Sequence, residues 1–301
     1  MSSSTFSNSQ TYIQPYLELS RPYNAVAALL TFAVGFVFYA PHHSWLIMAL
    51  GLLVILLLHS SFTVQNDVYD YEIDLANKRK SALTKKRVTK AALQRFVWYS
   101  VLAALAASAY NQQKLYFLGF ILLFVFLAWC YNCPPLFLSR RPVWSILLLA
   151  LYYASTPFLF GFTLGGNGSG LAVILFCVAL SVQRFSVSIL KDYKDVAGDK
   201  KHGKQTFLLA YGHRAVALLS ILGCALGYLG VFGVLLLHFR PHRVGAYLAL
   251  SALLVVVAIN IHRRLKLWNN HDNADLTELF SQSFRGENQC NAVLVVCLAL
   301  L

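Results

Sequence analysis

Long runs of apolar residues follow one another along nearly the whole chain, separated by short polar segments. A helix needs about 20 such residues to cross a hydrocarbon core of roughly 30 Å. The pattern predicts an all-α integral membrane protein with eight clear transmembrane helices and a ninth, short one. These helices are expected near residues 24–40, 44–64, 92–110, 115–131, 143–164, 171–190, 214–238, 244–262 and 291–301.

The composition supports this prediction. Hydrophobic residues make up 58% of the 301 positions and charged residues only 12%, which is half the charged share of an ordinary soluble domain. No linker divides the chain, so we expect one polytopic membrane domain over residues 1–301. The first 20 residues are polar and lack the basic-then-apolar order of a cleaved signal peptide. We expect residues 1–22 to form a cytoplasmic segment with a helix on the membrane surface.

The net charge of +13 is explained better by the positive-inside rule than by nucleic-acid binding. If the N-terminus is cytoplasmic, nearly every charge falls on the cytoplasmic side. Of the 25 basic residues, only Lys114, Arg240 and Arg243 fall in predicted outer loops, and none of the 12 acidic residues does. We therefore expect no nucleic-acid partner, cytoplasmic loops at 65–91 and 191–213, and a location in a bacterial-type inner membrane.

Two acidic clusters stand at equivalent helix ends on this face. The first comprises Asn66, Asp67, Asp70 and Asp74, and the second Asp192, Asp195 and Asp199. On a helix, spacings of three, four and seven residues place these carboxylates on one face, where like charges repel. Solvated loop segments would also carry acids. However, half of the acids of an acid-poor chain lie in these two clusters.

A hard divalent cation would relieve this repulsion. Mg²⁺ binds through one or two carboxylates and keeps positions open for substrate phosphates. Two facing clusters therefore predict a diphosphate site that uses Mg²⁺. Lysines and arginines surround both clusters, and Lys191 and Lys194 lie within the second one, where they can reach phosphate.

The residues from Asn66 to Asp74 match the NDxxDxxxD motif of the UbiA superfamily of intramembrane prenyltransferases. The segment Lys191 to Asp199 resembles the second motif of that superfamily, in the form KDxxDxxGD. The segment from Tyr131 to Pro135 is similar to the YxxPP turn of the family, and Arg140 and Arg141 follow it. Arg21-Pro22 resembles the start of its first helix. The resemblance implies nine helices around a central cavity.

The resemblance also implies an activity, the Mg²⁺-dependent transfer of a prenyl chain from a polyprenyl diphosphate to a small acceptor within the bilayer. Metal binding falls to the residues of the two clusters, and the catalytic residues are Asp67, Asp70, Asp192, Asp195 and Tyr131. Phosphate contacts fall to Lys191, Lys194, Arg140 and Arg141. The chain departs from the family at Ser81 to Lys86, where many members have RPLxxG, and this departure leaves substrate choice open.

A carbocation formed at the prenyl chain needs a π-rich, dry lining. Tyr69, Tyr131, Tyr152 and Tyr153 are candidates, and Tyr131 stands within a matched motif. Arg184 lies inside a predicted span, two helical turns before Asp192. An intramembrane charge is a candidate functional residue, although snorkelling to the interface is an alternative.

Several functions remain open. The main prediction is prenyl transfer to an aromatic acceptor. Alternatives are a glycerol-phosphate, sugar-phosphate or tetrapyrrole acceptor, and a terpene cyclase of the same superfamily. A transporter is the alternative of a different class, but transporters hold their charges near the midplane. A phosphotransferase acting on nucleotide-activated alcohols would carry a DGxxAR signature, which this chain lacks.

The charge distribution predicts that the N-terminus and both acidic clusters face the cytoplasm, and that the loop Gly165 to Gly170 faces outward. A cysteine introduced at Ser169 should react with a membrane-impermeant maleimide added from outside. Labelling of the Ser169 variant from the cytoplasmic side alone would show that the predicted number of spans is wrong.

Overall fold

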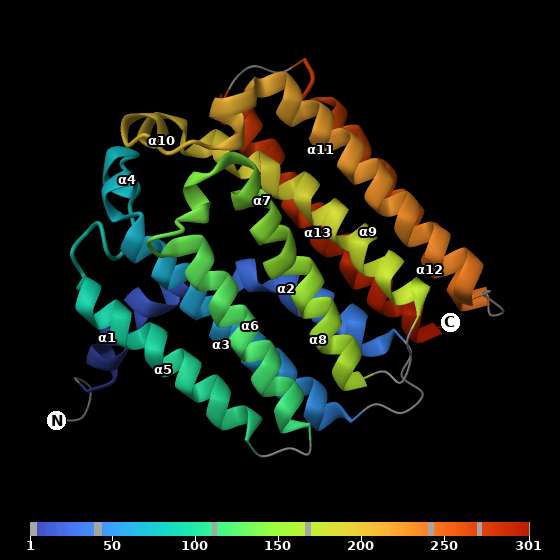
Figure 1. Ribbon diagram of the computed structural model, residues 1–301, viewed down its shortest axis with the longest axis horizontal. Helices are drawn as coiled ribbons and strands as arrows, with labels where there is room; N and C mark the ends of the chain where they lie inside the picture. The colour runs from blue at the N-terminus through green and yellow to red at the C-terminus, as the bar shows by residue number, and fades with distance from the viewer. Residues whose placement is uncertain are drawn as a thin grey trace.

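The structure is a computed structural model that describes residues 5–38, 44–109, 113–165, 170–239, 244–269 and 273–300. Over these residues it contains helices and connecting segments but no strand. The long helices lie side by side, as Figure 1 shows. Two short helices, α4 (Tyr71–Ala76) and α10 (Val196–Lys201), pack together at one end of the bundle.

The helices follow the predicted apolar runs closely. The N-terminal half holds α1 (Thr5–Ser20), α2 (Pro22–Val37), α3 (Trp45–Tyr69), α5 (Lys90–Ser108), α6 (Lys114–Asn132), η1 (Leu138–Arg140) and α7 (Pro142–Ala150). The C-terminal half holds η2 (Leu151–Ser155), α8 (Thr156–Gly165), α9 (Leu171–Ser188), η3 (Ile189–Lys194), α11 (Phe207–Val234), η4 (Leu235–Phe239), α12 (Val244–Leu265) and α13 (Asn273–Leu300).

Seven of the described helical rods are long and apolar enough to cross a membrane, and α2 is a shorter apolar helix. Together with α13 they make about nine rods in the described part of the chain. The prediction of an all-α, multi-pass integral membrane protein is thereby confirmed. The outer loop predicted at Gly165 to Gly170 lies largely outside the described residues.

The sequence prediction was wrong about the last helix, which begins at Asn273 rather than near residue 291 and has 28 residues. Polar side chains hide its first half from a hydropathy pattern. Ser283, Glu287 and Asn291 are nonetheless buried, and the last two face polar partners on other helices. Glu287 pairs with Arg184, and Asn291 donates to the Thr31 hydroxyl at 3.3 Å.

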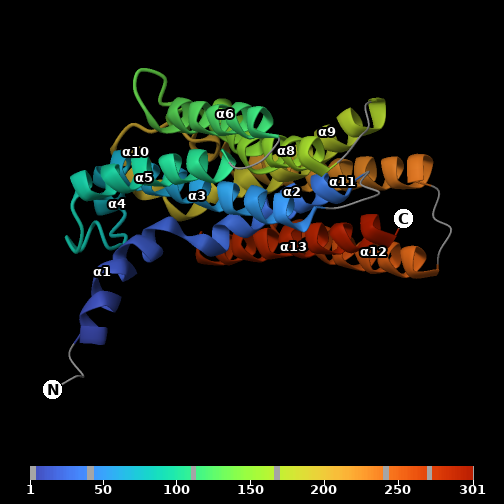
Figure 2. The same ribbon diagram turned by 90° about the horizontal axis from the view of Figure 1, so that it is seen from below.

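The helix α1 extends away from the bundle, as Figure 2 shows. Its described side chains Ile13 and Leu17 are each 58% exposed. These exposed apolar side chains suit the predicted position on the membrane surface.

Helices α2 and α8 touch through glycines. A Cβ atom on Gly161 would lie 2.0 Å from the Phe32 carbonyl oxygen, and one on Gly35 would lie 2.0 Å from the Phe158 carbonyl oxygen. Small residues allow such close backbone contact, which is a main source of helix association in lipid. This contact brings the N-terminal and C-terminal halves of the bundle together beneath the acidic clusters.

Gly161→Ala should destabilise the protein, because the backbone of α2 cannot move aside without disturbing the bundle. Overpacking of this kind costs about 1–3 kcal/mol. The matched control is Gly119→Ala on α6, where an added Cβ meets nothing within 4 Å. Thermal unfolding in detergent should show a lower midpoint for Gly161→Ala only. Equal midpoints for the two variants would contradict this account of the α2–α8 contact.

Candidate active site

The two acidic clusters have the same local structure. Asp70 and Asp195 each precede a six-residue helix, α4 and α10 respectively. After each helix comes one residue with positive φ, Lys78 at 53° and Gly203 at 64°. The chain then turns back, and the next residue donates its backbone N–H to the last aspartate of the cluster. The two segments therefore share one local structure, a helix–turn unit.

Each unit ends in a basic residue whose side chain forms ion pairs with the aspartates of the same unit. Arg79 Nη1 lies 2.9 Å from Asp74 Oδ2 and 3.1 Å from Asp67 Oδ1. In the second unit Lys204 Nζ lies 3.6 Å from Asp199 Oδ1. In both units the basic residue is the fifth after the last aspartate, so the same turn delivers both charges.

The two units are also tied to each other. Lys204 Nζ lies 3.2 Å from Asp70 Oδ2, across the gap between the clusters. The backbone N–H of Gly198 donates to Asn77 Oδ1 at 2.6 Å, and a Cβ on Gly198 would lie 2.4 Å from that side chain. The glycine of KDxxDxxGD thus permits the two motifs to meet.

Arg21 holds the most deeply buried acid. The Asp67 side chain is fully buried, and it pairs with both Arg21 and Arg79. Arg21 has a left-handed backbone with φ of 45°, which turns its side chain towards Asp67 from the start of α2. Asn66 donates to Asp70 at 3.2 Å and to Asn132 at 3.0 Å. The first motif is therefore anchored to both α2 and α6.

A cavity of about 740 Å³ opens between these groups and reaches down between α2, α9 and α13. Both acidic clusters line it. The acids on its wall are Asp70, Asp74, Asp192, Asp195 and Asp199, and the bases are Arg21, Arg79, Arg184, Lys191, Lys194, Lys204 and Arg285. This volume lies within the usual range of small-molecule sites. Cations outnumber anions on the wall, so the cavity favours anionic ligands.

One wall of the cavity is aromatic. Lys191 Nζ donates to the Tyr131 hydroxyl at 2.8 Å and lies 5.3 Å from the centre of that ring. Tyr153 also lines the cavity, whereas Tyr152 donates to the Leu58 carbonyl at 3.1 Å. Both tyrosines lie in η2, a π-helical turn, and such turns are frequent at functional sites. This wall can shield a carbocation from water.

Arg184 forms the deep end of the cavity. Its Nη1 lies 2.6 Å from Glu287 Oε2, and both side chains are buried. The guanidinium lies over the Tyr153 ring at 4.3 Å and the Phe284 ring at 5.0 Å. Arg184 therefore does not snorkel to the interface. Glu287 neutralises part of its charge, and Arg184 also lines the cavity.

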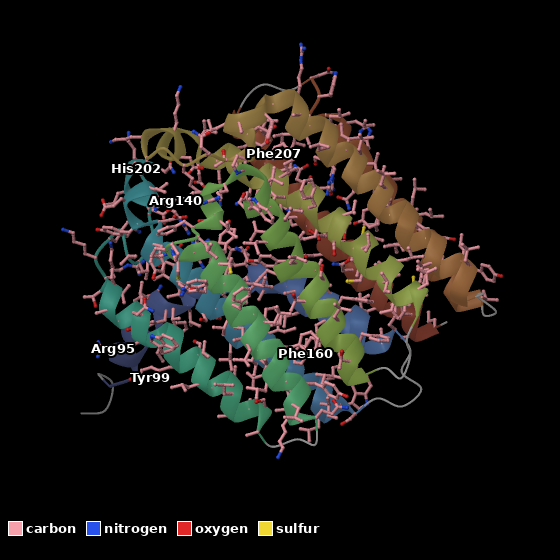
Figure 3. The ribbon with its side chains drawn as sticks, viewed as in Figure 1. Arg95, Tyr99, Arg140, Phe160, His202 and Phe207 are labelled. Carbon is pink, nitrogen blue, oxygen red and sulfur yellow. The ribbon has the colours of Figure 1, made fainter. Side chains whose placement is uncertain are left out.

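Three predicted residues are not brought to this cavity. Tyr69 packs edge-on against Phe137 at 5.8 Å and lines a different groove. Arg140 stacks on the same Phe137 at 4.4 Å, and Arg141 is exposed at the start of α7. In Figure 3, Arg140 lies at the end of the molecule that carries His202, away from Phe160 among the helices. The Phe137 ring, at a residue with φ of 39°, contacts both Tyr69 and Arg140 outside the cavity.

The carboxylates fit a hard cation. Asp67 Oδ2, Asp192 Oδ2 and Asp199 Oδ1 are buried without a hydrogen-bond partner, and buried carboxylate oxygens are costly unless they are paired. Within the described ranges, no three His, Cys, Asp or Glu side chains converge on one point. Carboxylates that are separated in this way suit Mg²⁺, which takes few protein ligands and completes its coordination shell with phosphate and water. The residues that would hold it are Asn66, Asp67, Asp70, Asp74, Asp192, Asp195 and Asp199.

The shifted pKa values reflect this crowding. Burial, reinforced by Asp67 and Asp70, raises the pKa of Asp74 to about 8, even though Arg79 is close. Burial raises the pKa of Asp199 to about 6, and the Lys204 charge opposes that rise. For Lys204 the attraction of Asp70 and Asp199 outweighs burial and raises its pKa. Burial is the main cause of the raised pKa values of Asp74 and Asp199, so a cation close to either carboxylate stabilises its charged form.

Sequence reasoning gave no site role to Arg79, Lys204, Asn77 or Glu287. In the sequence, Arg79 and Lys204 are two of the many lysines and arginines that surround the clusters. Their equal distance from the last aspartate of each motif is the signal that identifies them. Glu287 gave no such signal, because its partner is far away in the sequence.

The geometry can be compared with known proteins. The chain is 28% identical over 267 residues to digeranylgeranylglyceryl phosphate synthase of Pyrococcus abyssi, covering 87% of this chain and 90% of that protein. The corresponding protein of Methanospirillum hungatei is 27% identical over 267 residues, covering 85% and 88%.

A solved structure of a UbiA homologue from Archaeoglobus fulgidus bound to GPP and Mg²⁺ shares this fold, with a TM-score of 0.65 and 21% identity. That similarity covers 93% of this chain and 99% of the other. The sequence pattern that describes the UbiA prenyltransferase family matches residues 28–284. Paired acidic units, a cavity and a family pattern over most of the chain lead to one conclusion: the protein belongs to the UbiA prenyltransferase family.

Proposed function

We propose that this prenyltransferase transfers a prenyl chain from a polyprenyl diphosphate to a glycerol-phosphate acceptor, in a reaction that depends on Mg²⁺. The observation that carries the proposal is the single cavity lined by both acidic clusters and by seven basic side chains. A diphosphate needs such a mixture of metal ligands and direct cationic contacts.

The chain's own residues have distinct roles in this proposal. Lys191, Lys194 and Lys204 bind phosphate oxygens and orient the leaving group. Tyr131 and Tyr153 cover the allylic carbon and exclude water from it. Mg²⁺, when bound, neutralises the charge that develops on the diphosphate as the C–O bond breaks.

The acceptor proposal differs from the aromatic acceptor expected from the sequence. The relatives are named for digeranylgeranylglyceryl phosphate, so their names favour the glycerol-phosphate alternative. The cavity supports this choice on the wall formed by α9 and α13, apart from the acidic clusters. Arg184 is buried there, whereas Arg285 is exposed and pairs with Glu278 at 3.0 Å. These two arginines can hold a second anionic group. Phe280 and Phe284 beside them offer an apolar surface for a lipid chain.

The acceptor is tested by supplying purified protein with labelled geranylgeranyl diphosphate, Mg²⁺ and one acceptor at a time. We expect a product with geranylgeranylglyceryl phosphate and none with 4-hydroxybenzoate. An aromatic product alone would reject the glycerol-phosphate acceptor. A hydrocarbon formed without any acceptor would indicate a terpene cyclase, and the Asp195→Ala variant provides the background.

Asp70→Ala and Asp195→Ala should each lower turnover on the order of 100-fold or more, because each removes charge that holds the leaving group. The double variant should lose far less than the product of the two factors, since residues that act as one unit are not additive. Steady-state kinetics of the three variants measure this. Wild-type turnover by Asp195→Ala, or full activity in excess chelator, would rule out the two-cluster site.

Arg184→Lys should raise the KM for the acceptor by about tenfold and change the KM for the diphosphate little. A lysine keeps the charge but loses the planar fork that contacts Glu287 and a phosphate together. The matched control is Arg214→Gln, which removes an exposed charge from α11. The double variant Arg184→Gln with Glu287→Gln avoids an unpaired buried charge. Unchanged KM values in both Arg184 variants would show that this pair only supports the fold.

A further inference from the structure

A second cavity of about 370 Å³ lies between α3, α5 and α6, outside the acidic site. We name it the α3–α5–α6 groove. Fourteen residues line it, and no ion-pairing side chain is among them. Its wall therefore differs from that of the active-site cavity, which carries both acidic and basic side chains. A ligand of the groove carries no net charge, because nothing described around it would compensate for a buried charge.

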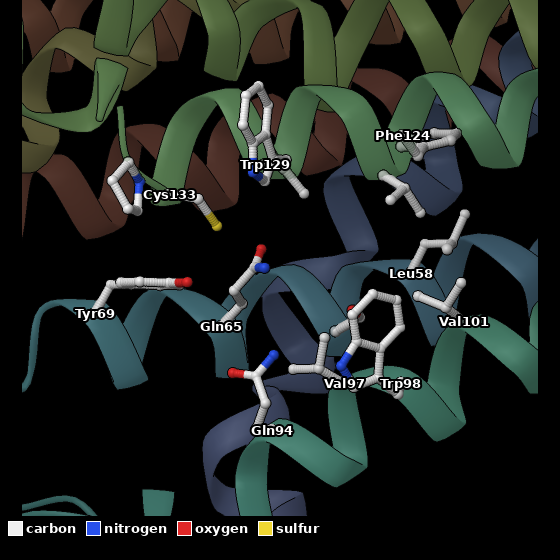
Figure 4. A pocket seen from close by; sticks show the side chains of 14 residues that line it. Leu58, Gln65, Tyr69, Gln94, Val97, Trp98, Val101, Phe124, Trp129 and Cys133 are labelled. Atoms are coloured by element: carbon white, nitrogen blue, oxygen red, sulfur yellow. The ribbon is translucent and has the colours of Figure 1, made fainter. Parts of the chain in front are cut away.

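The groove is polar at one end and apolar at the other, as Figure 4 shows. Gln65, Gln94, Tyr69 and Cys133 stand at the polar end. Leu58, Val101 and Phe124 form the apolar end. The groove thus matches a molecule with a small hydrogen-bonding head and an apolar chain.

The polar end is organised by neighbouring groups. Asn132 donates to Gln65 Oε1 at 3.4 Å, which leaves the Gln65 amino group as a donor for an oxygen atom in the groove. Tyr69 and Cys133 also line this end of the groove. A hydroxyl head suits this end because it can accept from one amide and donate to another.

The outer sides of the groove are tryptophans. Trp98 is 58% exposed and Trp129 is 40% exposed, and both border the groove (Figure 4). Tryptophan favours the interface between headgroups and hydrocarbon. The cavity has room for about a dozen groups of roughly 30 Å³ each. This size fits a head and the first part of a chain, with the remainder in the bilayer.

We infer that the α3–α5–α6 groove binds an uncharged long-chain alcohol from the bilayer, with its hydroxyl between Gln65 and Gln94 and its chain along Val101 and Phe124. Binding at this site does not depend on the acceptor proposed for the active site. Its failure and the failure of the proposed acceptor are thus separate results.

The probe is hexadecanol with a photoreactive diazirine in its chain, added to the full-length protein in nanodiscs. Labelled peptides should come from α3, α5 and α6, and labelling should saturate. Unlabelled hexadecanol should compete, whereas hexadecyl phosphate, which has the same chain and an anionic head, should not. Equal competition by hexadecyl phosphate would overturn the assignment of an uncharged head.

Two variants locate the site. Val101→Phe should fill the apolar end and abolish saturable labelling, while the control Leu102→Phe, at a 58% exposed position on the same helix, should not. Gln94→Leu should weaken competition by about fivefold, the effect of one hydrogen bond. Labelling that does not saturate, or that is unchanged in Val101→Phe, would mean that the probe meets only the surrounding lipid and would overturn the proposal. Competition in wild-type protein decides the matter even if a variant fails to fold.

Discussion

The repulsion between carboxylates at one face of the bundle is the constraint on which the rest of the structure depends. Six acids from two distant segments meet there, and several are buried. The protein offsets part of this charge with Arg21, Arg79 and Lys204. Three buried carboxylate oxygens still lack a hydrogen bond. A divalent cation would compensate these oxygens, and the excess of basic side chains on the cavity wall would favour an anionic ligand beside that cation.

The packing of the helices holds the two acidic clusters next to each other. Two copies of one helix–turn unit carry the acids, and the contact of Gly198 with Asn77 joins them. The glycine contacts of α2 with α8 close the bundle below. Arg184 and Glu287 extend the polar site into the membrane as a neutral pair, which is the form in which buried charges are tolerated. The hydrogen bonds from Asn66 to Asn132 and from Asn132 to Gln65 reach as far as the α3–α5–α6 groove.

Much of the fold could be predicted from the sequence, because lipid-crossing helices need long apolar runs and leave a clear signal. The helix α13 was missed in part, since polar residues before position 291, such as Glu287, indicate a loop until their partners are known. The acidic clusters were found because their spacing is local. Tyr69, Arg140 and Arg141 were expected at the active site from motif proximity, but the left-handed Phe137 turns two of them to its own ring. Contacts between distant segments, such as Lys204 with Asp70, leave no local pattern.

The most direct test of the central claim is the binding of Mn²⁺, as a spectroscopic substitute for Mg²⁺, measured by electron paramagnetic resonance with and without geranylgeranyl thiolodiphosphate. The account predicts weak binding to the protein alone and strong binding with the diphosphate analogue, because few protein ligands hold the cation. Asp70→Ala and Asp195→Ala should each abolish the strong binding. Strong binding that survives in either variant would contradict a site shared by the two clusters.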